Sequence, residues 1–438
     1  MGNGGYYPLQ VRTLLERGEL AFPDMPLLFY IDAGIVRLFT IFGTSISNEL
    51  IINIVKVVDS VSIPLLLLPL YQILKLSKKK NFSFYILSCI ALSVLSFQTL
   101  NLTSSFQKNS LAITILFFSI AWFVRFLTTR SRKHFIIAVT FFVLIGLTHF
   151  GTFTFALLAG TIYLVFRYKK KAVFPIVGLI ILALLLIYQF DPVRFSRLLL
   201  SWKGLFSKLP NPSQIVLTLT YLIIAFFAIR TFRKFKETFN RTDRAIILTL
   251  IALLIIIPFP IIDPQAASRL SAFLFIPVIL LLIKFDPIIT ILSKKLISIL
   301  LATITLGSIS FFLIMRPPAD VNKEALEDLY KMQPYMTEPD HTVVVSRHNL
   351  EFWVAWALEV DVSQESKFND TLISEYNEIF IINQIREVDS RIHPENNGKE
   401  EKRNHFDEPL IPVNSTLVYS SEYFKLYQYN KNLEVDKK

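Results

Sequence analysis

Residues 135–171 read FIIAVTFFVLIGLTHFGTFTFALLAGTIYLVFRYKKK, and this stretch decides the fold class. It holds two apolar runs, 135–148 and 151–167, which are separated by the tripeptide HFG and followed by a cluster of lysines. A helix crosses the hydrocarbon core of a bilayer with about 20 apolar residues, and shorter runs suffice inside a bundle. The stretch therefore predicts two membrane-crossing helices that form a hairpin at His149. One kinked helix is the alternative.

The same kind of apolar run recurs through the first 315 residues. Of the 438 residues, 53% are hydrophobic, 39 are Phe and only 18% are charged, which is more apolar than a soluble protein of this size can keep off its surface. Runs of sufficient length lie near residues 50–74, 83–101, 110–128, 135–148, 151–167, 173–190, 214–230, 245–262, 267–283 and 296–315. We therefore predict an all-α polytopic membrane bundle of about ten transmembrane helices over residues 50–315.

The basic residues between these runs predict the orientation of the bundle. Five loops hold 20 Lys and Arg, whereas the loops that alternate with them hold six; the basic loops are 75–80, 130–133, 167–171, 230–244 and 284–295. Since cytoplasmic loops of membrane proteins are enriched in Lys and Arg, these five loops are expected in the cytoplasm. Both the N-terminal segment and the C-terminal tail are then expected outside it.

The division of charge along the chain disfavours nucleic acid as a partner. Residues 1–315 hold 31 Lys and Arg against 11 Asp and Glu, and residues 316–438 hold 14 against 23. A basic membrane part with an acidic tail is typical of positive loops at an anionic lipid surface. The first 25 residues contain no cleavable signal peptide, and no eukaryotic targeting signal is visible. We expect a multi-pass protein of the bacterial inner (plasma) membrane, inserted through its internal spans.

Residues 1–49 are predicted to form a non-cytoplasmic loop that contains an interfacial helix. The apolar segment 26–43 includes Asp32 and Arg37 and has the wrong parity for a further span. A helix with a polar stripe, lying flat on the outer face of the membrane, fits it better. Segment 194–209 alternates basic and apolar residues, so it is either a second interfacial helix or an ordinary loop.

Residues 316–438 have the pattern of a small soluble α/β domain outside the cytoplasm. Three strands and two amphipathic helices are predicted, the strands at 341–346, 378–385 and 415–421 and the helices at 324–336 and 349–360. The charged run 395–408 is predicted to be a flexible insertion. The single cysteine, Cys89, excludes an internal disulfide and a cysteine-based metal site, and is expected to pack in an apolar run.

Known soluble motifs are absent, so ionisable residues at membrane depth are the candidates for chemistry. The outer loop offers an acid, cations and aromatic faces, which suit a sugar or phosphate site at the bilayer surface; the residues are Tyr6, Tyr7, Gln10, Arg12 and Asp24. An N-cap at Asp24 before Pro26 is the structural alternative.

Three further positions are candidates for binding phosphate. Lys108 opens a span and either attracts a lipid phosphate or extends its side chain toward the interface. His149, at the break of the hairpin, could bind phosphate or transfer protons. Arg269 opens another span, where a guanidinium suits a phosphate; an ion pair with Asp263 is the structural alternative.

Two other expectations concern packing. Lys56 and Asp59, near the outer end of the first span, are expected to form a neutralising pair. In the C-terminal domain, Trp353, Trp356 and His348 could contact an acceptor, although a packed amphipathic helix is the simpler interpretation.

The order of these features resembles the GT-C superfamily of polytopic glycosyltransferases. The resemblance consists of the loop YYPLQVRTLLERGELAFPDMPLLFY, the KN dipeptide that opens a later span, a TH dipeptide at an outer hairpin, an Arg before SAFLFIP and a soluble outer C-terminal domain. It implies transfer of a sugar from a polyprenyl-phosphate donor lipid on the outer face. It also implies that Asp24 is the catalytic acid or a contact of a divalent cation, whereas the acceptor and the need for a metal stay open.

One departure from the superfamily concerns the start of the chain. Members begin with a transmembrane helix that an acidic residue follows, whereas here Met1 lies inside the presumed first loop and Asn3 stands near the expected acid. We expect a leading helix upstream; loss of the acid is the alternative. A transporter or flippase of lipid-linked glycan, or a glycan polymerase, is the competing function. Clustering of the ionisable residues at the outer ends of the spans favours the transferase.

Overall fold

The computed structural model describes residues 4–77, 82–96, 99–100, 107–190, 212–258, 272–285, 291–315, 321–347, 349–363, 370–385 and 409–431. It divides the chain into two compact units. One contains Met1–Ala21, Ile35–Val55 and Arg316–Lys438, and the other contains Phe22–Gly34 and Lys56–Met315. The predicted interfacial segment 194–209, the predicted insertion 395–408 and His348 lie outside the described residues.

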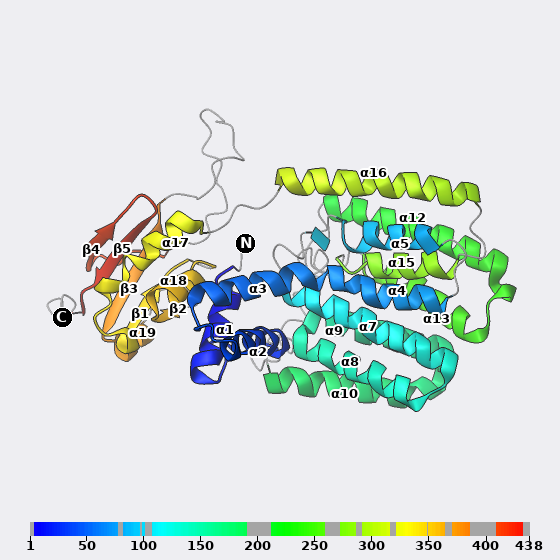
Figure 1. Cartoon of the computed structure of the whole chain (residues 1–438), viewed down its shortest axis with the longest axis horizontal. Helices are drawn as coiled ribbons and strands as arrows, with labels where there is room; N and C mark the ends of the chain where they lie inside the picture. Colours follow the sequence, from blue (N-terminus) through cyan, green and yellow to red (C-terminus); the bar gives the residue numbers. More distant parts are fainter. Residues whose placement is uncertain are drawn as a thin grey trace. The chain divides into compact units, whose positions relative to one another are not determined.

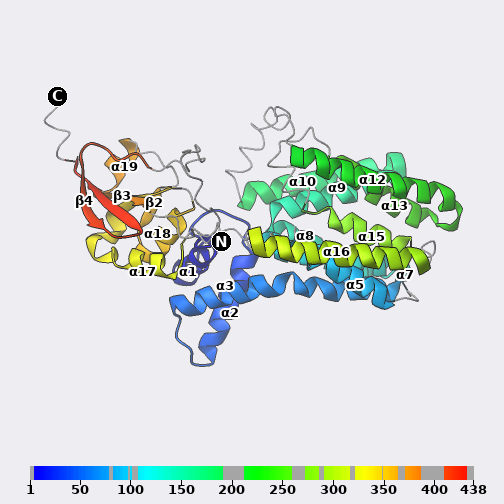
Figure 2. The same ribbon diagram turned by 90° about the horizontal axis from the view of Figure 1, so that it is seen from above.

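The second unit is a bundle of helices that lie side by side along a common direction (Figure 1 and Figure 2). Each of the ten apolar runs contains at least part of a helix. The helices from the first span onward are α3 (Asn48–Ser62), α4 (Leu67–Leu76), α5 (Phe82–Ser93), α7 (Gln107–Thr129), α8 (Arg132–Thr148), α9 (Phe150–Tyr168), α10 (Val173–Phe190), α12 (Pro212–Phe235), α13 (Arg241–Ile256), α15 (Phe275–Lys284) and α16 (Ile291–Met315).

Within the described ranges, four helical stretches are long and apolar enough to cross a membrane. They are Asn48–Leu76, Gln107–Thr129, Phe150–Phe190 and Ser293–Ile314. The chain thus has the character of a multi-pass membrane protein, whereas these four stretches do not support a total of about ten crossings. The stretch Phe150–Phe190 spans 41 residues, about twice the length that a bilayer core needs. It is divided at Lys169, whose positive φ of 52° ends α9 before α10 begins.

The hairpin predicted at His149 is confirmed, and the kinked single helix is wrong. Helix α8 ends at Thr148 and α9 begins at Phe150, while His149 between them has extended backbone with φ −156° and ψ 121°. Its Nδ1 accepts a hydrogen bond from the backbone N–H of Thr152 at 3.1 Å. An imidazole can therefore serve as the N-cap that starts the second helix of the pair.

Aromatic side chains fill the core of the bundle, and apolar side chains also cover its outer faces. The rings of Phe117 and Phe275 stack at 6.3 Å, and those of Phe155 and Phe273 at 5.2 Å. On α10, α12 and α16, exposed apolar residues include Leu185, Phe226 and Leu306. A water-soluble bundle would place polar side chains at such positions, so these faces suit lipid.

The N-terminal region contains two helices, α1 (Tyr6–Arg17) and α2 (Leu27–Ile41). The helix predicted over 26–43 is confirmed as a helix, whereas α1 was not predicted. The polar stripe proposed for α2 is wrong, because Asp32 is fully buried beside Phe29 and Ala33 on one helix face while Arg37 is exposed. Residues spaced by three and four share a helix face, so Asp32 occupies a core position.

The C-terminal domain is built on a five-stranded mixed sheet of order β2-β1-β3-β5-β4. Its strands are β1 (Thr342–Val345), β2 (Asp361–Ser363), β3 (Glu378–Gln384), β4 (Ser415–Ser420) and β5 (Phe424–Tyr429). Strands β2, β1 and β3 are parallel, and β5 and β4 are antiparallel. The three predicted strands are confirmed. The short β2 and the alternating β5 were not predicted.

Helices cover both faces of this sheet. Alternate residues of β1 and β3, such as Val344 and Phe380, pack against α17 (Lys323–Tyr330) and α18 (Glu351–Leu358). The residues between them, such as Val343 and Ile379, pack against α19 (Asp370–Glu375). Helix α18 was predicted to be amphipathic, but all its residues except Trp353 are buried. A helix that is apolar all round belongs inside a core, so Trp356 is not available to bind an acceptor.

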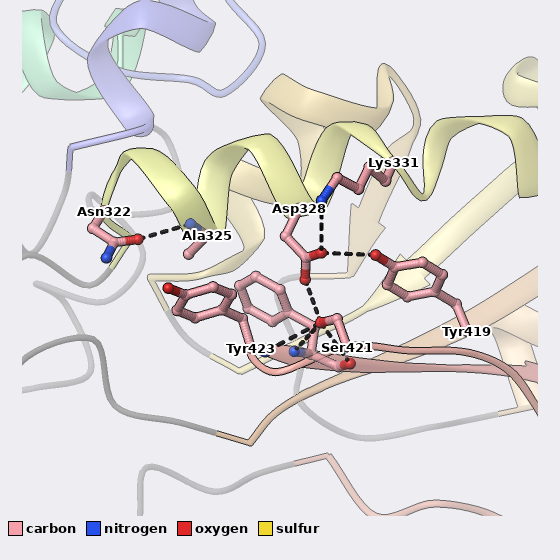
Figure 3. A network of polar contacts seen from close by, with 8 residues as sticks. Asn322, Ala325, Asp328, Lys331, Tyr419, Ser421 and Tyr423 are labelled. Carbon is pink, nitrogen blue, oxygen red and sulfur yellow. Dashed lines mark hydrogen bonds and ion pairs between the residues drawn. The ribbon is translucent and has the colours of Figure 1, made fainter.

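A buried carboxylate ties α17 to the β4–β5 hairpin (Figure 3). The Asp328 side chain is only 6% exposed and accepts hydrogen bonds from the Tyr419 hydroxyl at 2.7 Å and from the Ser421 hydroxyl. Ser421 Oγ in turn accepts from the backbone N–H of Phe424 at 3.0 Å. One acid therefore satisfies two hydroxyl donors and fixes the turn before β5.

Replacing Asp328 with Ala should destabilise the C-terminal domain by about 1–3 kcal/mol, because two partly buried hydroxyl donors lose their acceptor. Native-state proteolysis of the full chain in detergent would measure the change. Glu327→Ala is the matched control, since Glu327 is 61% exposed and 3.8 Å from Lys323, and its loss should cost at most about 0.5 kcal/mol. Equal effects of the two substitutions would show that the Asp328 network contributes nothing.

Candidate functional site

The first turn of α7 places a lysine against the acid that the sequence singled out. Lys108 and Asp24 form an ion pair across 84 residues, and their side chains are only 13% and 6% exposed. Asp24 Oδ1 also accepts a hydrogen bond from the backbone N–H of Met25 at 2.8 Å. The ammonium of Lys108 lies 5.7 Å from the centre of the Phe29 ring. A lysine extending its side chain into the interface would be exposed, so that alternative for Lys108 is wrong.

Burial makes this ion pair energetically sensitive. Two charges taken out of water lose their hydration, and their mutual attraction compensates only while both partners stay in place. The low dielectric of the surroundings strengthens the attraction between Lys108 and Asp24. An anion that arrives at this position can compete with Asp24 for the ammonium. The site therefore has an acid and a cation that compensate each other in a buried position.

Two more acids lie near the same end of α7. Asp32 on α2 is 0% exposed and Asp59 on α3 is 5% exposed. Asp59 hydrogen-bonds to the side chain of Gln107, the residue before Lys108. The neutralising pair of Lys56 and Asp59 was wrong, since Lys56 is exposed on α3 and makes no ion pair with Asp59 among the described side chains.

Several oxygens at these residues have no hydrogen-bond partner in the described part of the chain. They are both carboxylate oxygens of Asp32, Oδ1 of Asp59 and Oδ1 of Asn109. Burial first, and the neighbouring charge of Asp59 second, raise the pKa of Asp32 to about 8. Carboxylate and amide oxygens are ligands that hard divalent cations prefer, although only Asp32 and Asp59 among these residues are shown to act on each other. Within the described ranges no three His, Cys, Asp or Glu side chains come together as a metal site.

The two tyrosines of the N-terminal loop belong to the other compact unit, which contains the C-terminal domain. The Tyr6 hydroxyl accepts a hydrogen bond from Gln10 at 2.9 Å, and the Tyr6 ring meets Phe352 edge-on at 5.0 Å. Tyr7 is 5% exposed. A side chain on Gly5 would approach the backbone nitrogen of Trp353 to 2.8 Å, so glycine permits this close packing. These residues pack α1 against α18.

Arg12 completes the contact between α1 and α18. Its guanidinium donates to the carbonyl oxygens of Trp356 at 2.8 Å and Ala355 at 3.0 Å, and lies 4.5 Å from the Trp356 ring. It also pairs with Glu359 at 3.3 Å. Burial lowers the pKa of Arg12, and the charge of Glu359 opposes that shift. A cation at the carbonyl end of a helix stabilises it, so Arg12 has a structural role here.

Two predicted site residues remain: His149 caps a helix, and Arg269 lies outside the described residues. The Nδ1 of His149 accepts from a backbone N–H, so the ring carries its proton on Nε2 when neutral. Arg269 and Asp263 lie outside the described residues. Sequence reasoning used Asp32 only as part of a polar stripe and gave Gln107 no role. The spacing of Asp32 three residues after Phe29 was the signal that it faces a core.

These observations define a class: a helical bundle with four stretches that could cross a membrane, a C-terminal α/β domain, and a group of acids near the start of α7, one of them paired with a lysine. No protein-family model matches the chain, and no curated protein is similar enough to count as a relative.

A double-mutant cycle tests the buried pair. Lys108→Met or Asp24→Asn alone should lower the free energy of unfolding of the bundle by about 3–5 kcal/mol, because each leaves an uncompensated partner. The double variant should recover most of that loss, and denaturant unfolding in detergent would measure it. If the two single losses simply add in the double variant, the ion pair does not form.

Proposed function

We propose that this chain is a membrane glycosyltransferase that moves a sugar from a polyprenyl-phosphate donor to an acceptor on the non-cytoplasmic face. The observation that carries the proposal is the buried pair of Asp24 and Lys108 at the first turn of a candidate span. An acid and a cation held together at the end of an apolar helix provide what transfer from a lipid phosphate requires. The proposal extends to about ten crossings, in the bacterial inner membrane, with the C-terminal domain outside.

Each of the two residues has a distinct part in the reaction. The donor phosphate takes Lys108 as its counter-ion, which releases Asp24 to accept the proton of the acceptor hydroxyl. The acceptor oxygen then forms a bond to the anomeric carbon, and the bond from that carbon to the phosphate oxygen breaks. The phosphate keeps the electron pair, and Lys108 stabilises its charge.

Other residues extend this site in the proposal. Arg269 and His149 are further ligands for the donor phosphate. Membrane lipids surround the bundle and accommodate the polyprenyl tail; the proposal involves no nucleic acid.

Purified full-length protein in nanodiscs, supplied with radiolabelled polyprenyl-phosphate hexoses and pentoses, tests the proposal. The wild-type protein should release sugar from one of these lipids, and Asp24→Asn should slow the release about 10²–10⁴-fold. Lys108→Met should slow it as well, through weaker donor binding. Glu19→Gln, at an exposed acid of the same loop, is the control and should leave the rate unchanged.

Two outcomes would contradict the transferase. Movement of intact donor lipid between leaflets without cleavage would indicate a flippase or transporter. Products that carry many sugars on a single lipid would indicate a polymerase. Equal rates for Asp24→Asn and the wild-type protein would remove Asp24 from the chemistry.

A further inference from the structure

The turns at one end of the bundle hold many basic residues and few acids. Residues 130–133, 167–171 and 230–244 contain 13 Lys and Arg against two acids, Glu237 and Asp243. The turn between α7 and α8 and the turn between α12 and α13 lie at the same end of the bundle (Figure 1 and Figure 2). These are loops for which the sequence predicts a cytoplasmic location.

Three arginines from different turns converge at the last turn of α9. The Nη2 of Arg241, the first residue of α13, donates to the carbonyl oxygen of Arg167 at 3.3 Å, across 74 residues. The Arg167 side chain hydrogen-bonds to the Tyr163 hydroxyl one turn earlier on α9, and the charge of Arg130 acts on the same hydroxyl. The Tyr163 ring meets Phe123 of α7 edge-on at 5.7 Å, so the packing of α7 against α9 holds this arrangement.

The two acids of these turns are already paired with other residues. Glu237 pairs with Arg244 at 3.1 Å and with Lys236 at 3.7 Å, and Asp243 pairs with Lys284. Among the residues that the structure describes, no carboxylate pairs with any of the three converging arginines. Positive charges held close together repel one another, and an anion bound among them would remove that repulsion.

The surroundings of the three arginines favour a lipid over a soluble anion. Phe135, Phe166 and Phe174, which neighbour the basic residues in the chain, are all exposed, Phe174 by 88%. The exposed ring of Tyr168 has its centre 5.5 Å from the Arg167 guanidinium. Exposed aromatic rings beside Lys and Arg are typical of the boundary between hydrocarbon and water, where the phosphate of a lipid lies. Acyl chains would cover the apolar faces while the phosphate contacts the guanidinium groups.

We propose that Arg130, Arg167 and Arg241 bind the phosphate of one anionic phospholipid. A guanidinium suits this ligand because it donates hydrogen bonds in pairs to phosphate oxygens. The exposed lysines at 169–171 add positive charge that favours anionic over neutral lipids. Arg130 directly follows α7, whereas Lys108 lies in its first turn, which separates the two positions by about 30 Å along the helix. The lipid site therefore does not depend on the proposed sugar transfer.

Native mass spectrometry of the full-length protein in detergent is the test, with phosphatidylglycerol as the probe. The wild-type protein should bind one such lipid about tenfold more tightly than phosphatidylcholine, which has the phosphate but no net charge. Arg167→Gln and Arg241→Gln should each weaken the binding of phosphatidylglycerol about fivefold, because each removes charge-assisted hydrogen bonds. Lys75→Gln is the control and should leave binding unchanged, since it removes an exposed cation from α4.

A further variant and a second measurement cover the case in which those variants fold poorly. The Arg130 side chain is exposed, so Arg130→Gln should weaken lipid binding by a similar factor without lowering the Tm in lipid-free detergent. Phosphatidylglycerol should raise the Tm of the wild-type protein by about 5 °C when it is about 100-fold above its Kd. The rise should be smaller in about 0.5 M NaCl, because salt screens the arginines.

Two results would overturn the proposal. Equal binding of phosphatidylglycerol by the wild-type protein and by a triple variant with Gln at all three arginines would show that these side chains do not hold the lipid. Displacement of the lipid by millimolar inorganic phosphate would show that the site takes a soluble anion instead. Either result would leave the sugar-release assay with Asp24→Asn unaffected.

Discussion

A charged side chain inside an apolar bundle must have a partner, a ligand or a proton. The candidate site near the start of α7 depends on that constraint. Water cannot stabilise an ion at that depth, so each acid has to be compensated locally. Asp24 is compensated by Lys108. Asp32 lacks a partner in the described residues, and Asp59 has only a neutral one. One compensated acid, Asp24, and two acids without a cationic partner among the described residues therefore belong to the same unit of the chain.

Much of the architecture could be predicted because hydropathy and periodicity are local. The apolar runs locate the helices of the bundle, and the tripeptide at His149 marks a real break. Short runs rich in β-branched and aromatic residues identified β1, β3 and β4, and those in β1 and β3 are buried on both faces of the sheet. Strand β2 is only three residues long, so it carries too little pattern to predict. Helix α1 holds polar residues that are buried, which conceals it from a search for an apolar face.

The pairing of residues could not be predicted, since it depends on distant parts of the chain. Asp24 and Lys108 were each identified, but 84 residues separate them and nothing local indicates that they meet. Arginine is a common phosphate ligand, yet the partners of Arg12 are two backbone carbonyls on α18 and the side chain of Glu359. The sequence shows which charged residues lie in or beside apolar segments. Only the three-dimensional structure shows which of them have a partner.

The contact of Arg12 with α18 also constrains how the protein is made. The guanidinium and the Trp356 carbonyl are 344 positions apart, so α1 leaves the ribosome long before its docking surface exists. During that interval the buried face of α1 has no native partner. The C-terminal domain can complete its packing only after the whole membrane part has been synthesised, which makes assembly of this unit the last folding event and the one most open to quality control.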